Sequence, residues 1–307
     1  MRISLVTTVK NEAASIEVLI ESVRGQTRAP DEWIVVDGVS DDDTAERLRR
    51  SRACRLLVER GNIAHGRNTA IRHAVGEIVA VTDGGCRPEP EWLARLAAPI
   101  ERAEAAATAG RTRPRIGGPF DAVQWALLDQ FSAGGLRRPA LSSRSVAFRR
   151  PLWETCPYPE WLDTGEDSWL FDTWRRRGVA LLVIEDAVVE WQLRPSVGAF
   201  VRQHFHYMRG DGRALMHARR HALRIGFYGG LVALAGLGAG AATAAAAAWV
   251  GYLAATGVRL PGALAGRPWS FAARTVGVFP LALLTMDAAK IGGYGAGLAE
   301  RLRAGAP

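Results

Sequence analysis

Acidic and polar side chains gather at four places along this chain where carboxylates could bind a ligand, hold a metal ion or move a proton. The clusters are Thr7–Glu12, Val35–Gly38 with Ser40–Thr44, Val81–Cys86 with Pro90–Leu93, and Gly165–Asp167. Each cluster alone has an ordinary explanation, because polar strand ends and helix caps are common in α/β proteins. The occurrence of all four clusters in this order is a more specific indication of a functional site than any one of them.

The segments around the first three clusters alternate between strand-like and helix-like patterns. The expected strands are Ile3–Val9, Glu32–Asp37, Leu56–Glu59 and Ile78–Thr82, and the expected helices are Ala14–Arg24, a helix from Thr44, and His65–Ala74. This alternation predicts a parallel sheet with right-handed crossovers. Ligands of such sheets bind beyond the carboxyl ends of the strands. Asp37 and Asp83 both follow a strand, so we expect them at one edge.

The second half of the α/β region is less regular. We expect a helix over Glu91–Ala107, a loop at Arg111–Arg115 and a strand at Ile116–Phe120. Further strands are expected at Ser143–Phe148 and Val179–Ile184, with a helix over Asp167–Arg177 between them. Two loops are candidates for acceptor binding, namely 121–138 and 157–164.

Composition narrows the class of partner. The chain has 307 residues and a net charge of +8, and almost all of its basic residues are arginines. Five of them crowd just before a long uncharged stretch: Arg209, Arg213, Arg219, Arg220 and Arg224. Cytoplasmic arginines take this place beside a membrane segment, and no basic strip with interleaved aromatic residues indicates nucleic acid. Three scattered cysteines and the absence of a signal-peptide pattern predict a cytoplasmic catalytic domain.

Two apolar segments near the C-terminus are candidates for membrane helices. Ile225–Val258 contains no charged residue, and Phe271–Leu298 is interrupted only by Asp287 and Lys290, which could pair on one helix face. A membrane hairpin with both flanks cytoplasmic is the favoured interpretation. A soluble helical extension or an in-plane helix is the alternative. The expected domains are 1–205 (catalytic), 206–224 (basic juxtamembrane helix) and 225–300 (membrane hairpin).

The four clusters together resemble the inverting glycosyltransferases of family two, in particular membrane-associated bacterial-type members. The resemblance covers about residues 2–210 and includes the helix start Gly66–Ile71. It implies a GT-A α/β domain with a mostly parallel central sheet. It also implies inverting transfer of a sugar from a nucleoside-diphosphate sugar to a lipid or glycan acceptor at the inner or plasma membrane. Such a reaction would belong to cell-envelope, polysaccharide or glycolipid biosynthesis.

The resemblance also implies roles for individual residues. Asp37 would accept a hydrogen bond from a base with a ring N–H, and Arg67 would lie near the base and phosphates. Asp83 would contact the ribose and the metal ion that holds the diphosphate. Glu166 and Asp167 would form the acceptor-side pair, with Asp167 as general base. The residues placed under the nucleotide are Thr8, Lys10, Asn11 and Glu12.

Two of these roles have competing interpretations. The family's second metal-binding Asp is Gly85 here, so the expected Mg²⁺ or Mn²⁺ would lose a carboxylate ligand. His65 could compensate, or it could be a plain polar loop residue. Asp167 could act as a base or simply cap the helix that follows it.

Other functions remain open at this point. Gln203, His206 and Tyr207 only loosely resemble the motif of processive members, so we expect transfer of a single sugar. One rival is a nucleotidyltransferase, although no Gly-rich nucleotide-activating loop follows the first strand. The other rival is a membrane protein that binds nucleotide sugars without turnover, which Gly85 would suit.

Overall fold

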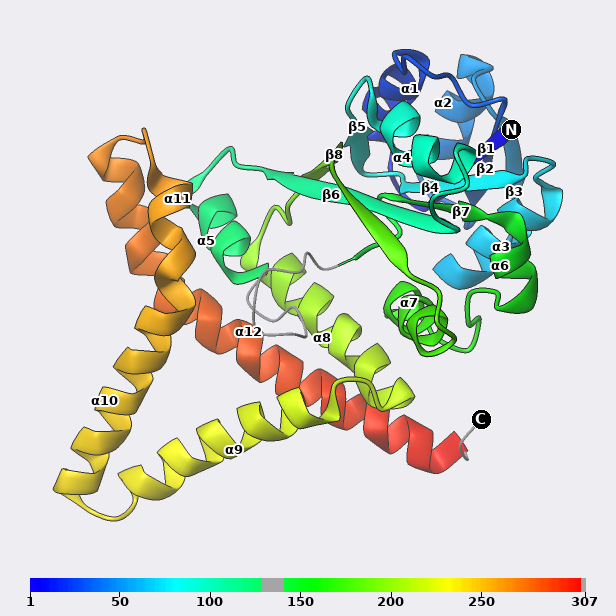
Figure 1. Cartoon of the computed structure of the whole chain (residues 1–307). Helices are drawn as coiled ribbons and strands as arrows, with labels where there is room; N and C mark the ends of the chain where they lie inside the picture. Colours follow the sequence, from blue (N-terminus) through cyan, green and yellow to red (C-terminus); the bar gives the residue numbers. More distant parts are fainter. Residues whose placement is uncertain (129–140, 305–307) are drawn as a thin grey trace. The chain divides into compact units, whose positions relative to one another are not determined.

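The computed structural model describes residues 1–128 and 141–304, which form two compact units (Figure 1). Unit 1 comprises Met1–Pro114 and Ala140–Gln192, and unit 2 comprises Arg115–Pro139 and Leu193–Pro307.

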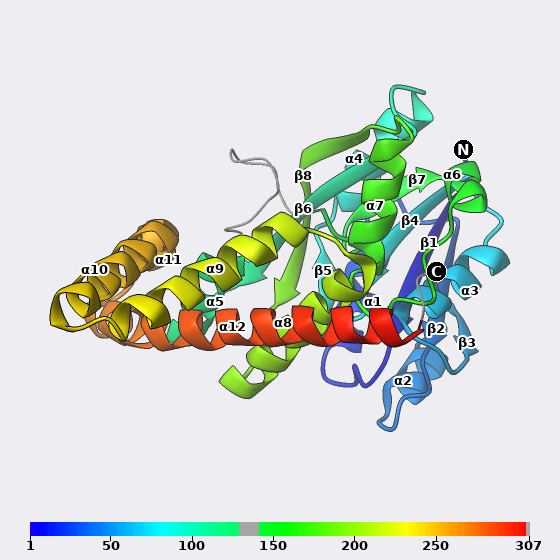
Figure 2. The ribbon, with the colours of Figure 1, turned by 90° about the horizontal axis from the view of Figure 1, so that it is seen from below.

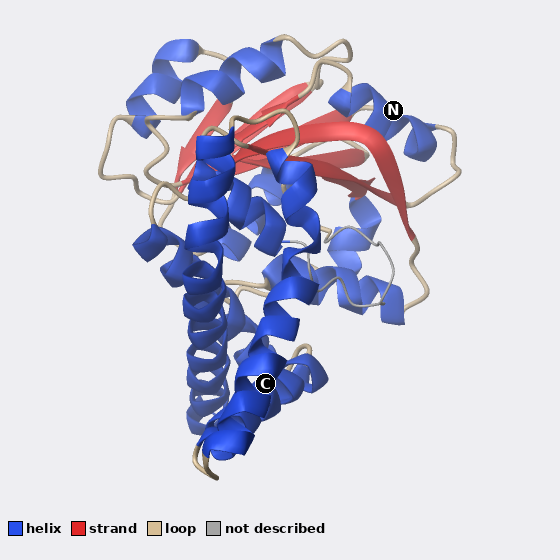
Figure 3. Cartoon of the chain, turned by 90° about the vertical axis from the view of Figure 1, so that its left-hand side faces the viewer, coloured by secondary structure: helices blue, strands red, loops and turns tan. Residues whose placement is uncertain are grey.

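Unit 1 is built on an eight-stranded sheet, which Figure 3 shows in red. The strands are β1 (Ile3–Val9), β2 (Glu32–Asp37), β3 (Arg55–Val58), β4 (Ile78–Asp83), β5 (Cys86–Pro88), β6 (Ala107–Arg115), β7 (Val146–Arg149) and β8 (Leu181–Gln192). Their spatial order is β3-β2-β1-β4-β7-β6-β8-β5. The four strands β3, β2, β1 and β4 are parallel, whereas β7 pairs antiparallel with both β4 and β6.

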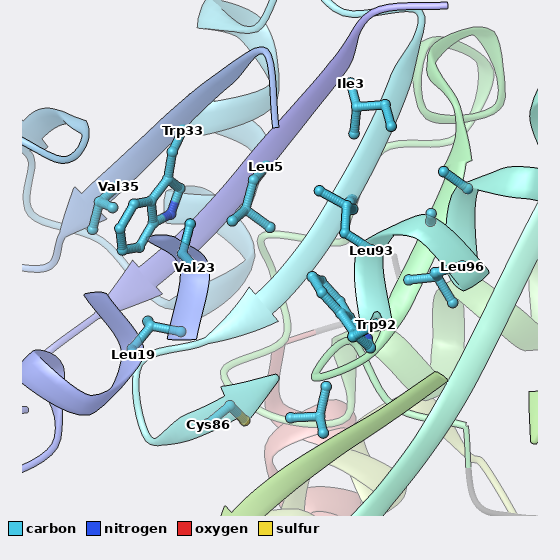
Figure 4. Packing of buried hydrophobic residues seen from close by; sticks show 14 of the residues in the cluster. Ile3, Leu5, Leu19, Val23, Trp33, Val35, Cys86, Trp92, Leu93 and Leu96 are labelled. Carbon is cyan, nitrogen blue, oxygen red and sulfur yellow. The ribbon is translucent and has the colours of Figure 1, made fainter. Parts of the chain in front are cut away.

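Helices cover both faces of this sheet because its strands are apolar on both sides. The helices of unit 1 are α1 (Ile16–Arg24), α2 (Thr44–Ser51), α3 (Ile63–His73), α4 (Trp92–Glu101), α6 (Arg150–Thr155) and α7 (Glu166–Arg176). On one face, α1, α2 and α4 bury a core around Leu5, Trp33 and Trp92 (Figure 4). On the other face, α3, α6 and α7 bury a second core around Phe148 and Trp174. Burial on both faces holds the carboxyl ends of the parallel strands rigidly.

The α/β fold predicted from the sequence is confirmed, and so are the expected strands and helices of its first ninety residues. Two later predictions are wrong. Arg111–Arg115 is not a loop but the second half of β6, where Arg111 and Arg113 form ion pairs with Glu185 and Glu190 of β8. These cross-strand pairs let a polar sequence remain in a sheet.

The expected strand Ile116–Phe120 is also wrong, because helix α5 (Pro119–Leu128) begins inside it. The backbone N–H groups of Gly117 and Gly118 donate to Asp121 Oδ2 at 3.0 and 2.9 Å, which caps this helix. The first part of the candidate acceptor loop 121–138 is therefore helical. Its remainder, 129–138, lies outside the described residues.

The described part of unit 2 is helical. Besides α5, its elements are α8 (Val197–Ala214), α9 (Ala218–Ala235), α10 (Ala239–Thr256), the 3₁₀ turn η1 (Gly257–Arg259), α11 (Leu260–Leu264) and α12 (Trp269–Ala304). Figure 2 shows α8 and α12 side by side. Glycines allow their backbones to touch: side chains at Gly212, Gly293 and Gly297 would collide with carbonyl groups of the opposite helix.

The long uncharged stretch does not form one helix. A turn at 236–238 divides it into α9 and α10, which pack against each other. By length and composition, the segments Ala239–Leu264 and Trp269–Ala304 could each cross a membrane. Asp287 lies in α12 and pairs with Arg224 of α9, with 2.9 Å between Oδ1 and Nε.

The start of α3 is fixed by His65. Its ring nitrogens lie 2.8 Å from the carboxylates of Glu59, just after β3, and of Glu160, in the loop 157–164. Asn68 of the same helix donates to the carbonyl oxygen of Tyr158 at 2.8 Å. Helix α3 therefore holds one of the two candidate acceptor loops in place.

We expect Gly297→Ala to lower the free energy of unfolding by about 1–3 kcal/mol, because the added Cβ would collide with the carbonyl oxygen of Arg209. Gly295→Ala on the same helix meets nothing within 4 Å and should be neutral or slightly stabilising. Chemical denaturation in detergent micelles measures both. Equal stability of the two variants would contradict the close approach of α8 and α12.

We also expect stability to depend on pH through His65. Its two carboxylate partners, Glu160 first and then Glu59, raise the pKa of the imidazole above its usual 6.5. The protonated ring stabilises the folded state fully below pH 6.5, and this contribution is lost as the pH rises through the raised value. His65→Gln should flatten the difference in urea unfolding midpoints between pH 5.5 and pH 8.5. An unchanged difference would show that this bridge contributes nothing.

Candidate functional site

Three of the predicted side chains lie at the carboxyl ends of neighbouring parallel strands. In the sheet register, Thr8 of β1 is opposite Asp83 of β4, and Val9 of β1 is opposite Asp37 of β2. The edge predicted from the strand pattern is therefore formed, and Asp37 and Asp83 flank β1 on either side.

Asp37 is fully buried and only half satisfied. Its Oδ1 accepts hydrogen bonds from the backbone N–H and the hydroxyl of Ser40, both at 2.8 Å. Its Oδ2 is buried without a hydrogen-bond partner, as is Oγ1 of Thr8. An unsatisfied buried carboxylate oxygen is costly. A ligand that brings an N–H donor to Asp37 would remove that cost.

Arg67 lies at the centre of the site. Its side chain is 2% exposed; one terminal nitrogen lies 2.7 Å from Asp83 Oδ1 and the other contacts Glu166 Oε1. The aromatic ring of Tyr158 lies 5.3 Å from the guanidinium carbon. Arg67 reaches this place because Gly66 lets α3 approach β1: a Cβ at Gly66 would lie 2.8 Å from Cγ2 of Thr8.

Glu166 and Asp167 form the first turn of α7, which follows Gly165 in a left-handed conformation (φ 78°) that favours glycine. Glu166 is buried, and burial, with the nearby Asp167 carboxylate, raises its pKa to about 7 despite the contact with Arg67. The carboxylate of Asp167 accepts from the backbone N–H of Ser168 at 2.7 Å and of Ser143 at 3.1 Å. Asp167 thus accepts a hydrogen bond from the start of its own helix, and the backbone at Ser143 also orients it.

The loop after β1 is anchored to the second acidic cluster. The backbone N–H of Asn11 donates to Ser40 Oγ at 2.9 Å, and the Asn11 side-chain oxygen accepts from the N–H of Asp41 at 2.8 Å. The N–H of Glu12 donates to Thr44 Oγ1 at 2.8 Å. Lys10 begins this loop and is exposed. The loop that the resemblance places under a nucleotide is therefore fixed before any ligand arrives.

The side chains around Asp83 do not form a set of metal ligands. Its Oδ1 pairs with Arg67, and its Oδ2 lies 3.9 Å from Nε of Arg144. Gly85 offers no side-chain ligand atom, and burial raises the pKa of the Cys86 thiol to about 12, which keeps it protonated. Within residues 1–128 and 141–304, no group of three or more His, Cys, Asp and Glu could hold a metal ion. His65, bound to Glu59 and Glu160, is engaged elsewhere.

Arg144 and Trp191 are the site residues that the sequence did not reveal. Trp191 of β8 pairs in register with Cys86, and its ring lies 4.1 Å from the guanidinium carbon of Arg144. This stacking holds a second guanidinium beside Asp83. Nothing in the local pattern marked Arg144, because it precedes β7 without any motif of its own.

Comparison with known proteins agrees with this geometry. Residues 4–146 match the family model described as glycosyl transferase family 2. The chain is 35% identical over 102 residues to glycosyltransferase AglE of Haloferax volcanii, a match that covers 30% of this chain and 33% of that protein. The chain thus spans about a third of the length of this curated relative.

Solved structures share the fold at low sequence identity. A mannosyltransferase from Pyrobaculum calidifontis in complex with GDP-Man and Mn²⁺ is 22% identical with a TM-score of 0.59, covering 94% of this chain and 87% of that one. S. aureus TarS 1–349 in complex with UDP is 17% identical with a TM-score of 0.50, covering 99% and 92%.

A third structure shares the fold over a shorter stretch. Glucosyl-3-phosphoglycerate synthase from Mycobacterium tuberculosis in complex with Mn²⁺, UDP-Glc and glycerol 3-phosphate is 23% identical with a TM-score of 0.51, covering 69% and 78%. The match of the family model includes Thr8, Asp37, Arg67 and Asp83. The segment that carries these four side chains is therefore similar to glycosyl transferase family 2, and its fold is that of the glycosyltransferase structures named above.

Proposed function

We propose that this protein transfers one sugar from a nucleoside-diphosphate sugar to an acceptor hydroxyl, with inversion at the anomeric carbon. The observation that carries the proposal is the buried Arg67, which joins Asp83 at the strand edge to Glu166 at the start of α7. It brings the donor-side and acceptor-side carboxylates into one site. The named complexes of the structural relatives, with GDP-Man, UDP and UDP-Glc, support a nucleotide-sugar donor.

The donor would bind along the carboxyl edge of the sheet. The free Oδ2 of Asp37 would accept a ring N–H of the base, while the loop of Lys10, Asn11 and Glu12 would lie under the nucleotide with Thr8. Asp83 would contact the ribose. The guanidinium groups of Arg67 and Arg144 would face the diphosphate, whose oxygens match their planar forks.

Inversion requires a base opposite the leaving group. The acceptor oxygen attacks the anomeric carbon as its proton passes to the carboxylate of Asp167, and the nucleoside diphosphate leaves with the electrons of the broken C–O bond. Two backbone N–H groups orient Asp167 for this task. Glu166 would instead hold Arg67 in place.

A divalent metal ion enters the proposal only as an expectation. Mn²⁺ is present in two of the related structures, and a bound metal would stabilise the departing diphosphate as a Lewis acid. At Asp83, however, the guanidinium groups of Arg67 and Arg144 lie beside the two carboxylate oxygens. We therefore propose that Arg67 and Arg144 neutralise the charge of the diphosphate.

The acceptor is proposed to be a lipid or a lipid-linked glycan at the inner or plasma membrane, with the catalytic domain in the cytoplasm. Two helices long and apolar enough to cross a membrane support this location. The arginines that precede them, Arg209–Arg224, support a cytoplasmic flank. Such an acceptor places the reaction in cell-envelope, polysaccharide or glycolipid biosynthesis.

Donor hydrolysis by the detergent-purified protein tests the transfer chemistry. We expect one class among UDP-, GDP- and dTDP-sugars to release nucleoside diphosphate, and Asp167→Asn to reduce transfer to a lipid acceptor about 10²–10⁴-fold through loss of the base. Nucleotide affinity should stay nearly unchanged in this variant. Full transfer by Asp167→Asn would remove Asp167 from the base role. Donor binding without release from any sugar would favour the binding-only rival, and release of pyrophosphate would favour a nucleotidyltransferase.

Calorimetry of nucleoside diphosphate binding tests the assignment of charge. Arg144→Gln should weaken binding about 10–100-fold, as expected for loss of a hydrogen bond between charged groups, with chelator as well as with Mn²⁺. Arg87→Gln, which changes an exposed arginine of β5, serves as the matched control. If binding required Mn²⁺ and were unchanged in Arg144→Gln, a metal ion at Asp83 would neutralise the diphosphate instead.

A further inference from the structure

The α9–α10 hairpin exposes apolar side chains over most of its surface. Val232 and Leu237 are 75% and 77% exposed, and Val250 is 61% exposed. No charged residue occurs between Ile225 and Val258. A continuous apolar surface of this kind on a folded chain indicates an apolar environment around it.

The base of the hairpin is tied to a single carboxylate. Asp287 of α12 is fully buried and pairs through Oδ1 with Arg224, near the start of the uncharged part of α9. Its Oδ2 accepts from the hydroxyl of Tyr228 in α9 at 3.0 Å and from that of Tyr252 in α10 at 2.7 Å. Both legs of the hairpin are therefore fixed level with Asp287.

This tie limits how far the hairpin can reach. At 1.5 Å per residue, the helical path from Tyr228 to the turn at Gly236 is about 12 Å, and the path from Gly238 to Tyr252 is about 21 Å. The hydrocarbon core of a bilayer is about 30 Å thick. With its base at the membrane surface, the hairpin enters the core but does not cross it.

The uncharged part of helix α12 is also too short to cross the hydrocarbon core. Its uncharged run between Arg274 and Asp287 has twelve residues, or about 18 Å. A crossing of the full core by this helix would carry a charged residue into the hydrocarbon, at considerable cost. Helix α12 is long and apolar enough to be a candidate span, but the positions of its charged residues disfavour a crossing of the full core.

The charges at the base of the hairpin match the surface of an anionic bilayer. Arg219, Arg220 and Arg224 lie within the first seven residues of α9. Arg219 is exposed, whereas Arg220 pairs with Asp211 and the buried Arg224 pairs with Asp287. Juxtamembrane basic residues gain about 1 kcal/mol each from anionic lipids. An exposed arginine at the base, with apolar side chains beyond it, is typical of a segment that lies partly in one leaflet.

We propose that the α9–α10 hairpin enters a single leaflet of an anionic bilayer, with the exposed Arg219 at the headgroups and its turn inside the hydrocarbon. The proposal rests on the membrane location in the proposed function and adds that the hairpin is re-entrant. The chain before and after the hairpin then stays on one side of the membrane. An acceptor lipid would have to present its hydroxyl in that same leaflet.

Depth measurement by spin labelling tests this proposal on the full chain. A nitroxide is attached to Leu237→Cys at the turn, and in separate samples to Val232→Cys and to Ala222→Cys near the base. The three native cysteines are replaced by alanine, and a circular dichroism spectrum equal to that of the unaltered chain confirms that each variant folds. The proteins are reconstituted into vesicles of equal parts phosphatidylglycerol and phosphatidylcholine, with a water-soluble nickel chelate on both sides.

The re-entrant arrangement predicts that oxygen, but not the nickel chelate, reaches the label at Leu237 and at Val232, whereas the chelate reaches the label at Ala222. Access of the chelate to Leu237 in vesicle-bound protein would mean that the turn emerges on the far side, and would overturn the proposal. Failure of the protein to float with vesicles would instead refute the membrane location itself.

Arg219→Glu provides an independent check that does not disturb a buried side chain. It should weaken binding to the phosphatidylglycerol vesicles several-fold and leave binding to pure phosphatidylcholine vesicles unchanged. Equal binding of this variant and the unaltered chain to anionic vesicles would contradict the role of the arginines.

Discussion

The ion pairs of the buried Arg67 guanidinium are the interaction on which unit 1 depends. A buried cation needs partners, because removing one partner of a buried ion pair costs about 3–5 kcal/mol. Here the partners come from two separate segments, Asp83 at the end of β4 and Glu166 at the start of α7. Helix α3, which carries Arg67, can reach both only because Gly66 removes the side chain that would collide with Thr8. One residue thus sets the spacing of three elements.

Residues adjacent to the partners of Arg67 are also held in fixed positions. Asp167 follows Glu166 and is oriented by N–H groups of two segments, and Arg144 is held beside Asp83 by the ring of Trp191. Charge of both signs is therefore arranged before a ligand binds. Such preorganisation is where enzymes gain most of their electrostatic stabilisation of a transition state.

Sequence reasoning was sound where a residue's type alone determines its place. The apolar runs Ile3–Val9 and Ile78–Thr82 predicted the parallel strands, and Asp37 and Asp83 were placed correctly because strand ends share an edge. The predictions were wrong or incomplete where residues far away in the sequence determine the local structure. The polar strand β6 persists through ion pairs with β8, and Arg144 enters the site through a strand from much later in the chain. Likewise, the charge count could not reveal that the uncharged stretch turns back at Gly236.

In the proposed donor site, the Asp37 oxygen that lacks a hydrogen-bond partner would determine which nucleotide bases can bind. A carboxylate is an acceptor only, so it attracts a base whose ring nitrogen carries a hydrogen and repels one that presents a lone pair there. Uracil, thymine and guanine belong to the first group; cytosine and adenine belong to the second. A site built to receive a donor discriminates against its absence by several powers of ten. Exclusion of CDP- and ADP-sugars would then follow from one atom that the fold leaves without a partner.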